Sequence, residues 1–163
     1  MIDIVVCGKN KNSQIDKLII NNFSGLNYVS INQSDNIPAF NTVNPIIIFK
    51  NSFTQKLNNS PIPHKAICIL NPENEFAINI LSEQNIPAIS CGMSGRDTFS
   101  LSSINFPKIS LSLQRQIFSV NDICIEPQEF VINVKKNYEP YSIMATCATI
   151  LLVYSSINSN TLF

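Results

Sequence analysis

The feature that most constrains the fold is a set of short apolar runs, rich in β-branched residues, that do not alternate with polar residues. The runs are IDIVVC at Ile2–Cys7, PIIIF at 45–49, KAICIL at 65–70 and PAISC at 87–91. A strand with one wet face alternates apolar and polar side chains, whereas a strand covered on both faces is apolar throughout. The runs therefore predict parallel strands in a sheet that lies between layers of helices.

Helices are expected between these strands. Ser13 is a suitable N-cap for a helix at 13–23, and Pro72 suits the first turn before a second helix at 73–84. An alternating strand is expected at 26–31. The order strand, helix, three strands, helix, strand is typical of an open α/β sheet.

The chain changes character after residue 97. Strand-like segments are expected at 98–104, 108–120 and 123–134, with turns at 105–107 and at Asn121 and Asp122. The stretch SLSLQRQIFS alternates, which predicts one wet face, and Pro127 must lie at an edge or a bulge. A closing helix is expected at Pro140–Tyr154, because its apolar residues recur at three- and four-residue steps.

We therefore expect one α/β domain over residues 1–163. Its architecture should be a three-layer, mainly parallel Rossmann-like sheet with a C-terminal antiparallel β extension and a closing helix.

Composition excludes some classes of protein. Lys and Arg total 11, as do Asp and Glu, so the formal net charge is +0. A nucleic-acid binder would normally carry a basic excess, so no nucleic acid is expected as a partner. Little charge also means little repulsion between copies, so a homo-oligomer or another protein partner stays open.

The sequence has little evidence of a segment that would direct the chain to a membrane. The N-terminus, MIDIVVCGK, lacks the basic and long apolar parts of a signal peptide. The most apolar run, 143–154, is shorter than the roughly 20 residues that cross a bilayer. We expect no membrane span and a cytoplasmic protein.

The five cysteines do not resemble a metal site. None forms a Cys-x-x-Cys pair, most lie in apolar runs, and His64 is the one histidine. Zinc sites group cysteine and histidine ligands, so we expect no metal and read the cysteines as small buried hydrophobes.

From residue 65 onward the chain resembles the second half of the central domain of Mur ligases, the ATP-dependent amide ligases of peptidoglycan synthesis. The matching series is KAICILNPEN, EFAINILSEQ, IPAISCGMSGRDTFSLSSI, ISLSLQRQIF, CIEPQEFVINV and NYEPYSIMATCATILL. The agreement lies in the order of elements and in the residues that end the strands, over half of the chain.

The resemblance implies a nucleotide-binding ancestry. The family's phosphate loop, Gly-Thr-Asn-Gly-Lys-Thr-Thr, matches GKNKNSQ here, so that Gly8, Asn10 and Ser13 fall on like positions. Asn71 keeps the family asparagine that contacts the nucleotide base, with Glu73 two residues later. These five residues are the nucleotide-binding candidates that the resemblance implies.

Departures from the family predict a non-catalytic relative. Lys11 and Asn12 replace the second glycine and the lysine of the phosphate loop, and Tyr138 and Glu139 stand where His-Asn would be. A phosphate loop needs its glycines and its lysine to hold the β and γ phosphates. We therefore expect no catalytic residues and no cofactor, with ATP or another nucleotide as the open alternative.

The stretch CGMSGRD at 91–97 offers a further candidate site. Cys91 ends a strand, where ligand sites of open α/β sheets lie, but His64 is too far along the chain to act as its base. GMSG is one residue short of the Gly-x-Ser-x-Gly nucleophile elbow. Arg96 is the candidate for contacting an anionic ligand, but local pairing with Asp97 at the surface is the favoured interpretation.

Two functions follow from these observations. The first is a non-catalytic binding or assembly module derived from a Mur-ligase-like domain, with a role in bacterial cell-wall metabolism. The second is a small nucleotide-binding protein or enzyme that uses the strand-end loops at Gly8, Asn71 and Cys91.

Overall fold

An eight-stranded mixed sheet forms the centre of the protein, in the order β10-β7-β6-β5-β4-β3-β1-β2. The computed structural model describes residues 1–57 and 60–158. The strands of this sheet are β1 (Ile2–Cys7), β2 (Val29–Ser34), β3 (Ile46–Phe49), β4 (Ile67–Leu70), β5 (Ala88–Gly92), β6 (Phe99–Asn105), β7 (Lys108–Leu113) and β10 (Gln128–Asn133). Strands β1 to β6 pair in parallel, whereas β7 runs antiparallel to both β6 and β10.

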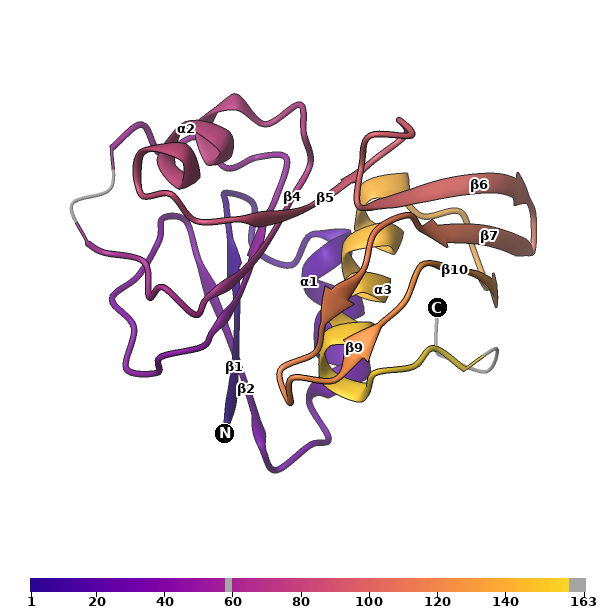
Figure 1. Ribbon diagram of the computed structural model, residues 1–163, viewed down its shortest axis with the longest axis horizontal. Coiled ribbons are helices and arrows are strands. Elements are labelled where there is room, and N and C mark those ends of the chain that lie inside the picture. The colour runs from indigo at the N-terminus through magenta and orange to yellow at the C-terminus, as the bar shows by residue number, and fades with distance from the viewer. Residues whose placement is uncertain (58–59, 159–163) are drawn as a thin grey trace.

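Three helices cover the two faces of the sheet, as Figure 1 shows. Helices α1 (Gln14–Phe23) and α3 (Pro140–Tyr154) pack on one face and share one apolar cluster with it. Helix α2 (Glu75–Glu83) contributes to a second cluster on the other face. The expected α/β fold, with a mainly parallel sheet, an antiparallel extension and a closing helix, is confirmed.

The two clusters explain why the apolar runs do not alternate. Along β3, Ile46 and Ile48 point into the cluster under α1 and α3, while Ile47 and Phe49 point into the cluster under α2. All four side chains have no exposed surface. Both faces of the central strands are therefore dry, as an unbroken apolar run requires.

Helix α3 is buried on nearly all sides. Its residues from Tyr141 to Val153 are buried, and it contacts both α1 and the strands β4, β5 and β6. Pro140 opens the helix, where a missing N–H costs nothing because that group has no partner inside the helix. The apolar run at 143–154, which is too short to span a bilayer, is thus part of a core helix. No helix in the described part of the chain is long and apolar enough to cross a membrane.

The antiparallel extension has one wet face, as its alternation predicts. Ile109, Leu111 and Leu113 of β7 are buried under α3, while Ser110 and Ser112 between them are half-buried. On the partner strand β10, Ile132 is fully buried and Val131 is 52% exposed. Each strand therefore buries one face and leaves the other face more exposed.

Several boundaries differ from the sequence-based expectation. Strand β2 begins at Val29, since residues 26–28 form a turn, and it continues to Ser34. The two long strands expected at 108–120 and 123–134 are each interrupted, which leaves the short pair β8 (Ile117–Phe118) and β9 (Cys124–Ile125) as a separate hairpin. Pro127 lies between β9 and β10, where its missing N–H interrupts no ladder.

Strands β5 and β6 are parallel neighbours without a helix between them. A parallel connection normally requires a crossover of a dozen or more residues. Here β6 pairs only with the last two residues of β5, through Cys91 with Phe99 and Gly92 with Ser100. The link at 93–98 is short because β6 begins where β5 ends, and this offset leaves the first half of β5 without a partner on that side.

The two faces of β10 provide a direct test of this packing. We expect Ile132→Ala to lower the free energy of unfolding by about 2–5 kcal/mol, because it opens a cavity under α3. The neighbouring variant Val131→Ala should cost less than about 1 kcal/mol, because its side chain is half exposed. Urea unfolding of the two variants measures the difference, and equal losses would contradict the assignment of the faces.

Candidate functional site

A cleft of about 560 Å³ opens at the carboxyl ends of β4 and β5. Asn71 and Glu73 line it from the segment after β4, Gly92 from the end of β5, and Glu139 and Tyr141 from the start of α3. Ligand sites of open α/β sheets lie at this edge, and the volume is within the range of about 300–1,000 Å³ that is usual for small-molecule sites. The cleft is therefore the candidate functional site.

A chain of hydrogen bonds crosses one wall of the cleft. The Asn71 side-chain amide donates to Asn51 Oδ1 at 2.9 Å, and the Asn51 amide donates to Glu139 Oε1 at 2.6 Å. Asn71 Oδ1 also accepts from the Glu73 backbone N–H at 3.0 Å. These bonds hold three polar side chains, from the ends of β3 and β4 and the start of α3, in one orientation before any ligand enters.

Tyr141 forms part of the floor of the cleft. Its hydroxyl donates to the carbonyl oxygen of Phe49, at the end of β3, and lies 3.5 Å from that of Ile69. Complete burial raises the pKa of this phenol well above its ordinary value. Tyr141 therefore stays protonated and joins α3 to the sheet.

Gly92 and Asp97 shape the other wall. Asp97 is 4% exposed, and its carboxylate accepts the Ser94 backbone N–H at 3.0 Å, which closes the turn after β5. A Cβ atom on residue 92 would lie 2.4 Å from Asp97 Oδ2 and 2.9 Å from Pro72 Cγ. Only glycine allows the carboxylate and the proline to approach β5 so closely.

The charged groups of the cleft are all acidic. Glu73, Asp97 and Glu139 line it, and no lysine, arginine or histidine of the described residues does so. A polyphosphate needs cations or a Mg²⁺ ion to offset its charge. The lining is therefore suited to neutral or cationic ligands that form hydrogen bonds.

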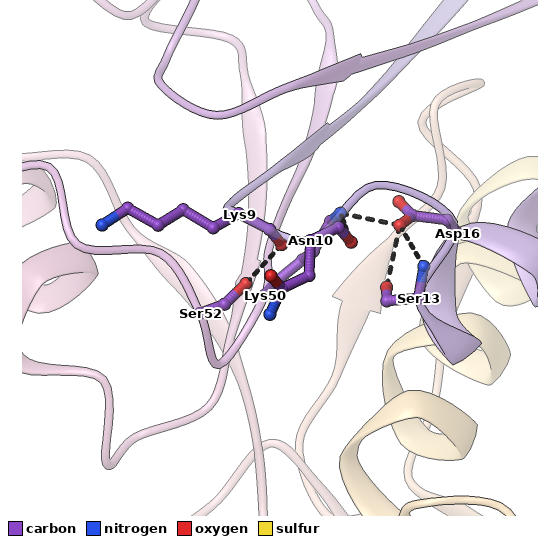
Figure 2. Close-up of polar contacts among 6 residues, drawn as sticks. All are labelled: Lys9, Asn10, Ser13, Asp16, Lys50 and Ser52. Atoms are coloured by element: carbon purple, nitrogen blue, oxygen red, sulfur yellow. Dashed lines mark hydrogen bonds and ion pairs between the residues drawn. The ribbon is translucent and has the colours of Figure 1, made fainter.

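The loop at 8–13 is closed by a lysine that comes from another strand. Lys50, directly after β3, places Nζ 2.7 Å from Asp16 Oδ2 and 3.2 Å from the Asn10 carbonyl oxygen (Figure 2). Both Lys50 and Asp16 are nearly inaccessible, with side chains 4% and 0% exposed. Asp16 also accepts from the Ser13 N–H and hydroxyl, both at 2.8 Å, at the N-terminus of α1.

This ion pair occupies two groups that could otherwise bind a phosphate, the ammonium group of Lys50 and the N–H of Ser13. Asp16 places a carboxylate at the N-terminus of α1, where the helix dipole would otherwise favour an anion. The charge of Lys50 is already neutralised by Asp16. Lys9 is exposed, and its side chain points away from this ion pair (Figure 2). A Cβ atom on Gly8 would lie 2.8 Å from Lys50 Cβ, so the lysine stem packs directly against the loop.

The structure separates the residues that the sequence singled out. Asn71 and Glu73 line the cleft, whereas Gly8, Asn10 and Ser13 lie in the loop before α1 and do not line it. Cys91 lies at the cleft but has no exposed surface. Arg96 is exposed in the turn after β5 and is not part of the cleft lining.

Sequence reasoning missed Asn51 and Lys50 as site residues and gave Glu139 no role. Lys50 and Asn51 directly follow an apolar strand, as Asn71 does, and this position was their one signal. Asn51 lies outside the strands and helices expected from the sequence, and its contact with Glu139 joins residues 88 apart in the chain. Contacts at that separation leave no local pattern.

The thiols of the central strands do not provide a nucleophile. Burial raises the pKa of Cys7 and of Cys68 to about 12, and burial together with the nearby Asp97 carboxylate raises that of Cys91 further. The thiolate is the reactive form, so these groups are inert at neutral pH. Cys124 is exposed, contrary to the reading of all five as buried.

Residues 1–57 and 60–158 contain no cluster that could hold a metal ion. Such a cluster would need three or more side chains of histidine, cysteine, aspartate or glutamate.

The chain was compared with models of known protein families and with curated protein sequences, and it matches none of them. The resemblance to Mur ligases stays a prediction.

The buried ion pair gives a test of how the loop is held. We expect Lys50→Met to lower the free energy of unfolding by about 3–5 kcal/mol, because Asp16 is left as a buried charge without its cation. The matched control is Lys17→Met, at an exposed position of α1 next to Asp16. It should change the free energy of unfolding by less than about 1 kcal/mol.

A double variant separates the ion pair from simple loss of packing. Adding Asp16→Asn to Lys50→Met removes the unpaired charge while keeping an oxygen for Ser13, so it should recover a good part of the lost stability. If the double variant is less stable than Lys50→Met alone, the stabilising role assigned to charge pairing is wrong. Guanidinium chloride unfolding measures all four proteins.

Two glycines form a matched pair for the cleft wall. Gly92→Ala should destabilise the protein by about 1–3 kcal/mol, since the new methyl group overlaps the Asp97 carboxylate. Gly25→Ala meets no atom within 4 Å and should be close to neutral. Thermal unfolding followed by circular dichroism compares them, and a neutral Gly92→Ala would show that the turn relaxes easily.

Proposed function

We propose that this protein is a non-catalytic binding module whose ligand enters the cleft at the carboxyl ends of β4 and β5. The observation that carries the proposal is the lining itself. Pre-oriented amides and carboxylates line a cavity of small-molecule size, and no cation or ionisable thiol of the described residues joins them. Such a site can bind and orient a ligand, but it has neither the cations of a phosphoryl-transfer site nor a thiolate nucleophile.

The ligand class follows from the charge and the hydrogen-bonding groups of the cleft. Glu73 and Glu139 are exposed carboxylates that favour N–H donors and positive charge. Asn71 and Asn51 provide both donors and acceptors for a planar polar group. We expect a neutral or cationic molecule rich in hydrogen-bonding groups, of which a nucleoside without phosphates is one example.

A relationship to the Mur ligase central domain is the context that we propose for this binding. It is supported by the position of Asn71 after β4, of Gly92 at the end of β5 and of α3 after the antiparallel strands, in the order of the family's elements. On this proposal the chain is a relative that keeps a binding cleft without phosphoryl transfer, in bacterial cell-wall metabolism.

Binding of an intact nucleotide is the second candidate, because Gly8, Asn71 and Cys91 all end strands at the same edge of the sheet. The acidic cleft and the neutralised Lys50 beside the loop make it the weaker one. The two candidates differ in whether phosphate groups improve or weaken binding.

Calorimetric titration with adenosine and with Mg²⁺-ATP distinguishes the candidates. We expect adenosine to bind more tightly than Mg²⁺-ATP, because the triphosphate would face three carboxylates and no free cation. Asn71→Ala should weaken adenosine binding roughly tenfold, while Asn21→Ala, an exposed position on α1, should leave it unchanged.

Opposite results would overturn the proposal. Tighter binding of Mg²⁺-ATP that is lost in Asn71→Ala would favour the nucleotide-binding candidate. ATP-driven formation of an amide bond by the isolated protein would contradict a non-catalytic role.

A further inference from the structure

A second hollow, which we call the amino-edge groove, lies at the opposite edge of the sheet. It has a volume of about 420 Å³ and is lined by the amino ends of β4 and β5 on one side and by residues 115–118 on the other. It shares no lining residue with the cleft. Any ligand of the groove is therefore independent of the function proposed above.

The groove exists because of the offset between β5 and β6. Strand β6 pairs only with Cys91 and Gly92, so the first half of β5 has no strand beside it. Ala88 is exposed for this reason, although β5 lies between two other strands in the sheet. The segment that leaves β7 passes alongside this gap without closing it.

The floor and one wall of the groove are apolar. Ile89 and Ile117, which are 8% and 7% exposed, belong to the large core cluster, and Ile67 packs against it. Phe118 lines the groove and is 53% exposed. An apolar body of a few carbon atoms could bury this surface, which water now covers.

Arg115 supplies the one charge in the lining. It is exposed at the groove, and the single ion pair found among the described residues joins Lys50 and Asp16, so Arg115 has no carboxylate partner there. Thr98 and Gln116 add polar groups beside it. A planar guanidinium binds a carboxylate through two parallel hydrogen bonds.

We propose that the amino-edge groove binds a small monocarboxylate with an apolar body, such as a medium-chain or aromatic acid. The apolar part would lie on Ile89, Ile117 and Phe118, and the carboxylate would pair with Arg115. A single guanidinium matches one negative charge, whereas a polyphosphate or a nucleic acid would require several cations. The mixture of apolar surface and a few convergent polar groups is usual for small-molecule sites.

The test uses the two arginines of the chain, Arg96 and Arg115, as a matched pair. Hexanoate is titrated into the ¹⁵N-labelled protein and followed by amide chemical shifts. We expect shifts at the groove residues, with a Kd on the order of 1 mM or lower. Arg115→Gln should weaken binding roughly tenfold, while Arg96→Gln, in the turn after β5, should bind hexanoate like the unchanged protein.

Two further probes separate the parts of the site. Acetate lacks the apolar body and 1-hexanol lacks the charge, so both should bind more weakly than hexanoate. Shifts outside the groove, equal binding of 1-hexanol and hexanoate, or an unchanged affinity in Arg115→Gln would each overturn the proposal. Because Arg115 is exposed, its replacement should leave the amide spectrum otherwise intact, which confirms that the variant is folded.

Discussion

The ion pair of Lys50 with Asp16 joins the end of β3 to the start of α1, and other atoms of Lys50 hold the neighbouring elements. The Lys50 side chain holds Asp16 at the start of α1 and the Asn10 carbonyl in the loop after β1. Its backbone N–H donates to Cys7 at the end of β1, and its carbonyl accepts from Asn74, the N-cap of α2. One residue thus joins the central strands to helices on both faces, and it places the next residue, Asn51, at the cleft. A buried charge is costly unless it is paired, so these contacts depend on one another.

The same ion pair explains why a loop that resembles a phosphate site in its glycine and serine has its nearest buried cation and a helix N-terminal N–H already occupied. Anion sites at helix N-termini need free N–H groups and an unopposed positive field. Here the Ser13 N–H is already bonded to Asp16, and Lys50, the buried cation beside the loop, is already paired with the same carboxylate. The sequence showed that Asn12 stands where the resembling phosphate loop has its lysine, but it did not show that Lys50, directly after β3, enters the space next to the loop. That contact joins residues 34 apart and has no local signature.

Local patterns predicted the architecture well, because each central strand is covered on both faces and each outer strand on one. Unbroken runs such as IIIF and alternating runs such as SLSL carry that information residue by residue. Strand ends were less predictable, because a strand stops where its partner stops. The segment after Leu113 remained strand-like in composition, yet it leaves β7 at the point where its pairing with Phe99 and Gln128 ends. Asn71 could be found from the sequence because it directly follows an apolar run. The groove at Arg115 could not, because it results from the register of β5 with β6, which no local pattern records.

The net charge of +0 is a sum over the whole chain and does not describe the charge of the cleft or of the amino-edge groove. The cleft at the carboxyl edge is lined by carboxylates, while the groove at the amino edge has one guanidinium. Strands β4 and β5, four and five residues long, separate the two edges by about 13–17 Å at roughly 3.3 Å per residue. That separation exceeds the screening length of about 8 Å at physiological salt, so the exposed charges of one hollow have little influence on a ligand in the other. A parallel sheet of this kind can therefore present sites of opposite preference at its two edges, and composition alone would reveal neither.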